Sequence, residues 1–186
     1  MTTTGTTYTL GDGRGAVRVE DVYDTGIDDL WQACTVPERL ARWIGNVDGD
    51  LREGGTVRAV LTSTWTGPIK IETCEAPHHL LLTLEPGTDE QTELEAWLAA
   101  EDTRTRLVVE ERGLPTDKLH FYGAGWQVHL EDLRRSLDTD GPVHLDGWSS
   151  ETPATAWRQR WTELTPVYLD ASVLLPASAP SRSASR

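Results

Sequence analysis

Five short runs between residues 56 and 111, in which apolar and polar residues alternate, constrain the fold of this chain more than any other feature. The runs are "TVRAVLTSTW" (56–65), "IKIETCE" (69–75), "LLLTLE" (80–85), "TELEAWLA" (92–99) and "TRLVVEE" (105–111). Alternation with period two is typical of strands that bury one face. Turn sequences such as Gly67-Pro68 and Pro86-Gly87 separate the runs. The pattern predicts an antiparallel meander.

A long amphipathic helix is predicted after the meander, in "LPTDKLHFYGAGWQVHLEDLRRSL" (114–137). Its apolar face follows steps of three and four through Leu119, Gly123, Trp126, Leu130, Leu133 and Leu137. Before the meander, residues 15–23 alternate like a further strand, and residues 24–44 are typical of two short helices, with Pro37 opening the second. This order of elements predicts an α+β fold in two layers.

The charge of the chain excludes two classes of partner. The 186 residues include 30 acidic and 17 basic side chains, for a formal net charge of -13. Such a surface repels the phosphates of nucleic acids and of anionic membranes, so we expect neither as a partner. No stretch reaches the ~20 apolar residues of a membrane span, and residues 1–15 lack the pattern of a signal peptide. The sequence therefore predicts a cytoplasmic protein.

The composition changes beyond residue 138. "TPATAWRQRWTEL" (152–164) predicts a short helix with Trp157 and Trp161 on one face. We expect these indoles to hold the helix against its own domain, and a homodimer contact through this extension is the alternative. The predicted organisation is a flexible lead (1–13), a domain (14–138), a helical extension (139–175) and a disordered tail (176–186).

Few patterns in the sequence point to metal or cofactor chemistry. Cys74 with His78 and His79 is the only cluster of metal-ligating residue types, and its spacing matches no metal motif. The chain has no nucleophile elbow, no dinucleotide-binding glycine motif and no phosphate-binding loop. We therefore predict no metal and no cofactor.

Two acidic residues and one histidine are the candidates for acid–base chemistry. Glu110 and Glu111 are adjacent on a predicted strand, so one carboxylate must point inward. It could act as a general base or pair with Arg18 or Arg112, and pairing is the interpretation we favour. For His129, near the apolar face of the long helix, a hydrogen-bonded structural role is favoured over that of a base.

Three stretches resemble, in order, elements of bacterial START-like proteins related to the activator of the 90-kDa heat-shock protein ATPase, within the SRPBCC superfamily. They are "IDDLWQACTVPERLARWI" (27–44), then "REGGTVRAV" (52–60) with "IETCEAPHHLLLTLE" (71–85), and finally "TRLVVEERGLP" (105–115) with "YGAGWQVHLEDLRRSL" (122–137). The resemblance covers roughly residues 14–138 and rests on the order of several weak motifs.

The resemblance implies a helix-grip fold, in which a curved antiparallel sheet wraps a long C-terminal helix and two short helices follow the first strand. Many members of the superfamily enclose a cavity for a hydrophobic small molecule between sheet and helix. In this chain the candidate pocket residues are Trp43, Leu61, Trp65, Trp97, Tyr122, Gly123, Trp126 and Leu130.

Gly123 and Gly125 lie in the middle of the long helix, where each costs about 1 kcal/mol relative to alanine. Gly123 is the more informative because it lies on the apolar face. Its missing side chain either leaves room for a ligand or lets the helix pack closely against a neighbour. We favour the ligand cavity.

The function predicted from these features is that of a START-like domain holding a hydrophobic or aromatic small molecule, without assured catalysis. One alternative is an enzyme of the polyketide cyclase/aromatase type that uses the same cavity. Another is a protein-interaction module similar to a co-chaperone. A polar side chain with a perturbed pKa inside the cavity would distinguish the first alternative from simple binding.

Overall fold

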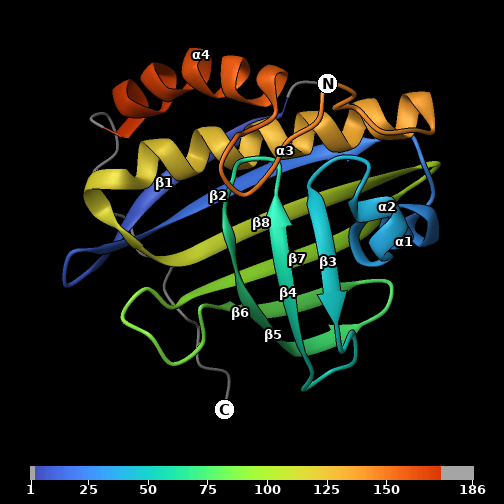
Figure 1. The fold of residues 1–186 in the computed structure, drawn as a ribbon, viewed down its shortest axis with the longest axis horizontal. Helices are drawn as coiled ribbons and strands as arrows, with labels where there is room; N and C mark the ends of the chain where they lie inside the picture. Colours follow the sequence, from blue (N-terminus) through green and yellow to red (C-terminus); the bar gives the residue numbers. More distant parts are fainter. Residues whose placement is uncertain (1–2, 173–186) are drawn as a thin grey trace.

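One antiparallel sheet of eight strands organises the structure, a computed structural model that describes residues 3–172 (Figure 1). The strands are β1 (Thr4–Gly11), β2 (Arg14–Tyr23), β3 (Gly45–Gly49), β4 (Thr56–Leu61), β5 (Thr66–Glu75), β6 (His79–Leu84), β7 (Thr92–Glu101) and β8 (Arg104–Pro115). The helices are α1 (Ile27–Thr35), α2 (Pro37–Leu40), α3 (Leu119–Thr139) and α4 (Thr155–Ser172), and a 3-10 turn, η1 (Thr116–Lys118), precedes α3. None of the helices within these residues is long and apolar enough to cross a membrane.

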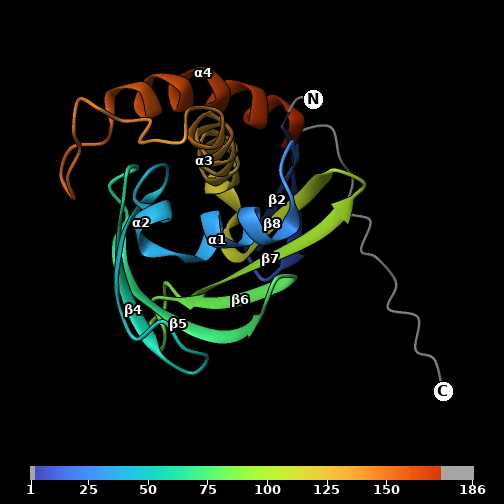
Figure 2. The ribbon, with the colours of Figure 1, turned by 90° about the vertical axis from the view of Figure 1, so that its right-hand side faces the viewer.

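The sheet is curved, and its last strand lies beside the first strands of the chain. The strand order is β1-β2-β8-β7-β6-β5-β4-β3, with every neighbouring pair antiparallel. Figure 2 looks nearly along α3 and shows the sheet curling around this helix, with α1 and α2 at one end. The predicted helix-grip α+β fold is thereby confirmed.

Two strands lie where the sequence predicted none. β1 occupies most of the lead (1–13) that we expected to be flexible, and it pairs with β2 from Thr4↔Glu20 to Gly11↔Arg14. This segment is rich in threonine, which favours strands, but it shows no apolar alternation because it forms an edge of the sheet. β3 forms the opposite edge, in a segment of glycine and aspartate that is typical of turns.

The predicted strand 56–65 is shorter in the structure. β4 ends at Leu61, a turn follows, and β5 begins at Thr66. Thr64 has a φ of 80° in this turn, a left-handed conformation that a strand cannot accommodate. Trp65 therefore lies beyond the turn, although Trp65 and Leu61 both line the same cavity.

The main core fills the space between the concave face of the sheet, α1 and α3. Leu30, Leu107, Leu114, Leu130 and Leu133 are among its fully buried members. Each buried leucine of this kind contributes roughly 1.5–3 kcal/mol by leaving water. The core thus fixes α3 in the grip of the sheet and determines where the remaining space lies.

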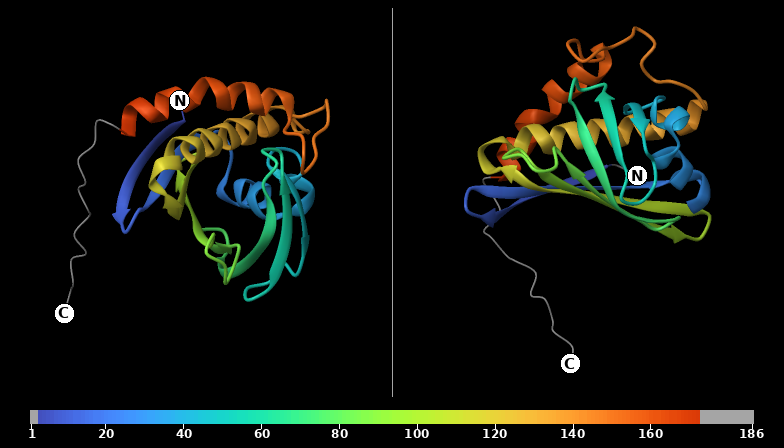
Figure 3. Two further views of the ribbon diagram at one scale, coloured as in Figure 1. Left: turned by 60° about the vertical axis from the view of Figure 1, so that its left-hand side comes forward. Right: turned by 60° about the horizontal axis from the view of Figure 1, so that its bottom comes forward.

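The extension beyond residue 139 forms α4, which packs on the side of α3 that faces away from the sheet (Figures 2 and 3). Ala124 and Val128 of α3 form a second apolar cluster with Trp157, Leu164 and Tyr168 of α4. α3 is therefore buried on two sides. The expectation that the extension packs on its own domain is confirmed, although α4 begins at Thr155. The predicted tail at 176–186 lies outside the described residues.

Gly123 faces α4 and opens no space beneath α3. A Cβ atom at this position would lie 2.6 Å from Cε1 of Tyr168. Gly5 of β1 also contacts this ring, and its Cβ would lie 2.6 Å from the Tyr168 Cζ. Our preference for a ligand cavity at Gly123 is wrong, because the glycine permits close helix packing. Gly125 differs, since its Cβ would make ordinary contacts with Trp157 at 3.6 Å and Trp161 at 4.0 Å.

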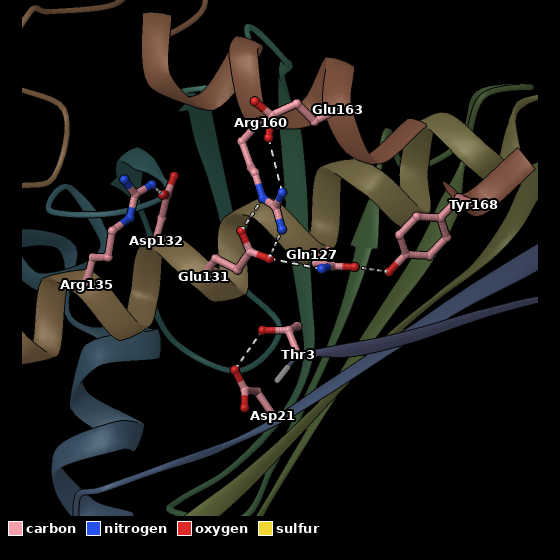
Figure 4. A network of polar contacts seen from close by, with 9 residues as sticks. All are labelled: Thr3, Asp21, Gln127, Glu131, Asp132, Arg135, Arg160, Glu163 and Tyr168. Atoms are coloured by element: carbon pink, nitrogen blue, oxygen red, sulfur yellow. Dashed lines mark hydrogen bonds and ion pairs between the residues drawn. The ribbon is translucent and has the colours of Figure 1, made fainter. Parts of the chain in front are cut away.

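A network of polar side chains also fixes α4 on α3 (Figure 4). Arg160 of α4 donates two hydrogen bonds to the Glu131 carboxylate of α3, at 2.9 and 3.0 Å. Gln127 donates to Glu131 at 2.9 Å, and its amide oxygen accepts a 2.9 Å bond from the hydroxyl of Tyr168. The side chain of Tyr168 is therefore held by packing against Gly123 and Gly5 and by the hydrogen bond of its hydroxyl.

Candidate functional site: an apolar cavity and its mouth

An apolar cavity of about 170 Å³ lies inside the curve of the sheet, beneath α3 and beside α1 and α2. Strands β4 to β8 supply most of its wall, and α3 contributes Trp126. Apart from Thr35 and two cysteines, every residue on the wall is aliphatic or a tryptophan. A wall of this composition suits an apolar ligand, or part of one about the size of an aromatic ring.

An open groove of about 670 Å³, here called the mouth, adjoins the cavity. It is lined by the β1–β2 and β4–β5 turns, the β6–β7 loop, the first half of α3 and the beginning of α4. Leu61, Trp65, Leu84 and Trp126 line both spaces. A ligand could therefore place one end in the cavity and the other in the mouth.

Glu111 is a buried carboxylate on the wall of the mouth, with 5% of its surface exposed. Its Oε2 accepts a hydrogen bond from Nε1 of Trp126 at 2.7 Å, and its Oε1 accepts one from Oγ1 of Thr92 at 2.8 Å. Burial raises the pKa of this carboxyl above its ordinary value, although both hydrogen bonds act in the opposite direction. Glu111 is thus the polar side chain with a perturbed pKa that the sequence could not place.

Glu110 points to the outer face of the sheet, as the period-two geometry of β8 requires. Its carboxylate pairs with Arg112 at 2.9 Å and with Arg18 at 3.3 Å. The ion pair that we favoured for an inward glutamate therefore belongs to the outward one. Within the described residues Glu111 has no ion pair, so our expectation for the inward carboxylate is wrong.

His129 lies one turn after Trp126 on α3 and also lines the mouth, with 4% of its surface exposed. Burial lowers the pKa of its imidazole to about 4, so the ring is neutral near pH 7. Its Nδ1 has no hydrogen-bond partner among the described residues, and neither has Nε1 of Trp157. We expected His129 to be a hydrogen-bonded histidine, but its Nδ1 atom makes no hydrogen bond to the described residues.

Aromatic rings dominate the rest of the mouth. Trp157 and Trp161 of α4 stack with ring centroids 5.9 Å apart, and Phe121 of α3 stacks on Trp161 at 5.4 Å. The ring of His129 lies between Trp126 and Trp157, at 5.8 and 5.5 Å. From the sequence we expected these two α4 indoles to pack on their own domain or to form a dimer contact, because nothing local to 152–164 shows that the helix would reach the mouth.

The structure brings together five of the eight predicted pocket residues. Trp43, Leu61, Trp65 and Trp126 line the cavity, and Tyr122 lines the mouth. Two of them, Trp43 and Trp126, are at most 9% exposed, so they belong to the core and to the wall at once. Whether these residues contact a ligand stays a prediction.

The other three predicted residues do not line either space. Gly123 packs against α4, and Leu130 is fully buried in the filled part of the core. Trp97 lies on the outer face of β7, because Ala96 and Leu98 on either side of it point inward. The alternation in "TELEAWLA" already places Trp97 on the same face as Glu93 and Glu95, opposite Ala96 and Leu98.

On the outer face Trp97 belongs to a polar array rather than to a pocket. Its ring stacks on that of His79 at 6.0 Å, and the Arg18 guanidinium carbon lies 5.8 Å from the ring centroid. His79 in turn lies 2.8 Å from the Glu95 carboxylate. These contacts give the indole two structural partners, His79 and Arg18.

The two cysteines are free thiols, and both line the cavity. Burial raises the pKa of Cys34 to about 12 and also raises that of Cys74, so both are protonated near neutral pH. Across residues 3–172 the structure contains no group of three or more histidine, cysteine and acidic side chains placed to hold a metal ion.

The family can be assigned from the match of one family model. The model is described as "Activator of Hsp90 ATPase homolog 1-like protein", or AHSA1, and it matches residues 24–138. The chain belongs to this family. The match spans α1 to α3 and hence most of the cavity wall. A comparison of this chain with curated protein sequences finds no significant match.

Solved structures of related fold extend the comparison to α4. The crystal structure of CalU16 from Micromonospora echinospora is 25% identical, with a TM-score of 0.69, and the match covers 91% of this chain and 96% of CalU16. The solution structure of CalU16 gives 26% identity, a TM-score of 0.71, and coverage of 91% and 94%. Residues 1–138 alone make up less of the chain than this coverage, so the similarity includes part of the extension.

A third structure shares the fold over a shorter length. DynU16, described as a protein in the dynemicin biosynthetic locus, is 24% identical with a TM-score of 0.64. The match covers 71% of this chain and 49% of DynU16. It supports the assignment of the AHSA1-type fold.

Proposed function

We propose that this AHSA1-family protein binds a hydrophobic or aromatic small molecule in the cavity between the sheet and α3. The observation that carries the proposal is the apolar cavity beneath α3, whose wall contains almost no polar group and which adjoins an open mouth. A filled core would leave no such space, since protein interiors are close-packed. Concave, mostly apolar sites with a few convergent polar groups are typical of small-molecule binding.

A cyclase-type enzyme is the second candidate, and Glu111 is the observation that favours it. A buried carboxylate with a raised pKa beside an apolar cavity has the character of a general acid or base. Native mass spectrometry of the freshly purified protein would identify a retained compound. Conversion of that compound by the wild type but not by Glu111→Gln would establish catalysis, whereas unchanged compound with both proteins would leave binding as the function.

The binding proposal predicts that filling the cavity blocks an apolar probe. Ala96 lies on the cavity wall, and Ala96→Phe would place a ring in the space. We expect the affinity for N-phenyl-1-naphthylamine, a neutral fluorescent probe, to fall at least about tenfold, a loss of about 1.4 kcal/mol. Fluorescence titration measures this directly.

The matched control is Ala99→Phe on the same strand, because Ala99 is exposed. This variant should bind the probe as the wild type does. Equal affinities of the wild type and Ala96→Phe, with both proteins folded, would show that the probe does not use the cavity.

A further inference from the structure

We propose that the mouth binds a protonated amine carried by the apolar ligand, with Glu111 as its counter-ion and the surrounding aromatic rings as its walls. This inference rests on the proposed function, because the apolar part of the same ligand would occupy the cavity. It adds a chemical class to the ligand: a cationic, hydrophobic amine.

The first argument is the unpaired charge of Glu111. An ionised carboxylate buried without an opposite charge is costly, and such groups in proteins are normally paired. Glu110, its neighbour in β8, has two arginine partners, whereas Glu111 has hydrogen bonds from Trp126 and Thr92 and no ion pair within the described residues. A ligand ammonium group would supply the missing charge.

The second argument is the kind of side chain around this carboxylate. Six residues with aromatic rings other than histidine line the mouth: Trp65, Phe121, Tyr122, Trp126, Trp157 and Trp161. The faces of such rings attract cations, and desolvation strengthens the attraction. Aromatic rings around one buried carboxylate favour an ammonium group over a neutral or anionic ligand group.

The third argument is the position of the basic residues. Arg14, Lys118 and Arg158 line the mouth, but all three are exposed. The Arg14 guanidinium also donates to the backbone oxygens of Gly113 and Asp89, at 2.8 and 2.9 Å. None of the three forms an ion pair with Glu111, so the buried part of the mouth contains a carboxyl group and no lysine or arginine.

His129 supplies an independent indication of a ligand. His129 lines the mouth, and its buried Nδ1 has no hydrogen-bond partner among the described residues. Buried polar atoms without a hydrogen-bond partner are rare in folded proteins. Burial lowers the pKa of the imidazole to about 4, so near pH 7 the ring does not compete with an amine for Glu111. In the tautomer with an unprotonated Nδ1, this atom can accept a hydrogen bond.

The test compares 1-naphthylmethylamine with 1-naphthylmethanol, which differ in the charged group but share the aromatic part. We expect the wild type to bind the amine at least about tenfold more tightly at pH 7, measured by calorimetry. In Glu111→Gln this preference should fall to within about twofold, because the counter-ion of the amine is lost. Glutamine removes the charge and keeps an acceptor for the Trp126 hydrogen bond, while the Thr92 hydroxyl can accept from the new amide NH2 group.

Glu110→Gln is the control, since Glu110 lies next in sequence but on the outer face, and it should keep the full preference. Equal binding of the two compounds by the wild type, or an undiminished preference in Glu111→Gln, would overturn the amine proposal. If either of these results is obtained but the alcohol and N-phenyl-1-naphthylamine still bind, the proposal that the cavity binds an apolar small molecule is unaffected. If none of the three compounds binds, both proposals fail.

Discussion

Replacing Gly123 by leucine is expected to destabilise the protein by about 3 kcal/mol or more, at the upper end of what overpacking costs. Even the first carbon of a side chain would overlap the ring of Tyr168, which is 3% exposed. Moving the ring away would disturb its close contact with Gly5 of β1 and the hydrogen bond from its hydroxyl to Gln127. Thermal unfolding should show a fall in Tm of roughly 5–10 °C.

Two further variants separate packing from helix propensity. Gly125→Ala should raise stability by up to about 1 kcal/mol, because its Cβ makes only ordinary contacts and alanine favours the helix. In a Tyr168→Ala background, Gly123→Leu should cost much less, since the overlapping ring is gone. A Gly123→Leu protein as stable as the wild type would contradict the packing role of Gly123.

The second large effect concerns acid. The wild type is expected to lose up to roughly 3 kcal/mol of stability between pH 6.5 and pH 4 through His129 alone. Burial lowers the pKa of this histidine to about 4 in the folded protein, with Asp132 raising it in part and His144 lowering it further. In the unfolded chain a histidine binds a proton near pH 6.5, so in this window acid favours the unfolded state.

His129→Phe removes this titration and keeps a ring between Trp126 and Trp157. The difference in the free energy of unfolding between variant and wild type should grow by about 1.4 kcal/mol per pH unit as the pH falls below 6.5. Urea unfolding at pH 7, 6 and 5 measures the difference. A difference that is the same at all three values would refute the buried, neutral histidine.

The fold was predictable because its signals are local and repeated. Alternation in the five runs and the three–four spacing from Leu119 to Leu137 each report a buried face, and their order leaves few architectures. β1 and β3 escaped prediction because edge strands bury little and so carry no apolar alternation. The division of the chain at residues 138 and 175 stays a prediction.

The site was predictable only in part, because its parts meet through tertiary contacts. The sequence required one inward glutamate but could not choose between Glu110 and Glu111, since the register of β8 decides this. Gly123 was misread because α4, which supplies Tyr168, lies outside the segment that carried the apolar pattern. The contribution of Trp157 to the mouth depends on the same docking.

The most direct test of the cavity as a binding site uses the indole N–H resonances of the eight tryptophans. In protein labelled with ¹⁵N, addition of N-phenyl-1-naphthylamine should shift the resonances of Trp43, Trp65 and Trp126, whose side chains line the cavity. The resonance of Trp97, on the outer face, should not move. Single Trp→Phe variants assign each signal. Saturable shifts of the three cavity indoles are the predicted result, and a bound probe that moves Trp97 while leaving those three unchanged would contradict it.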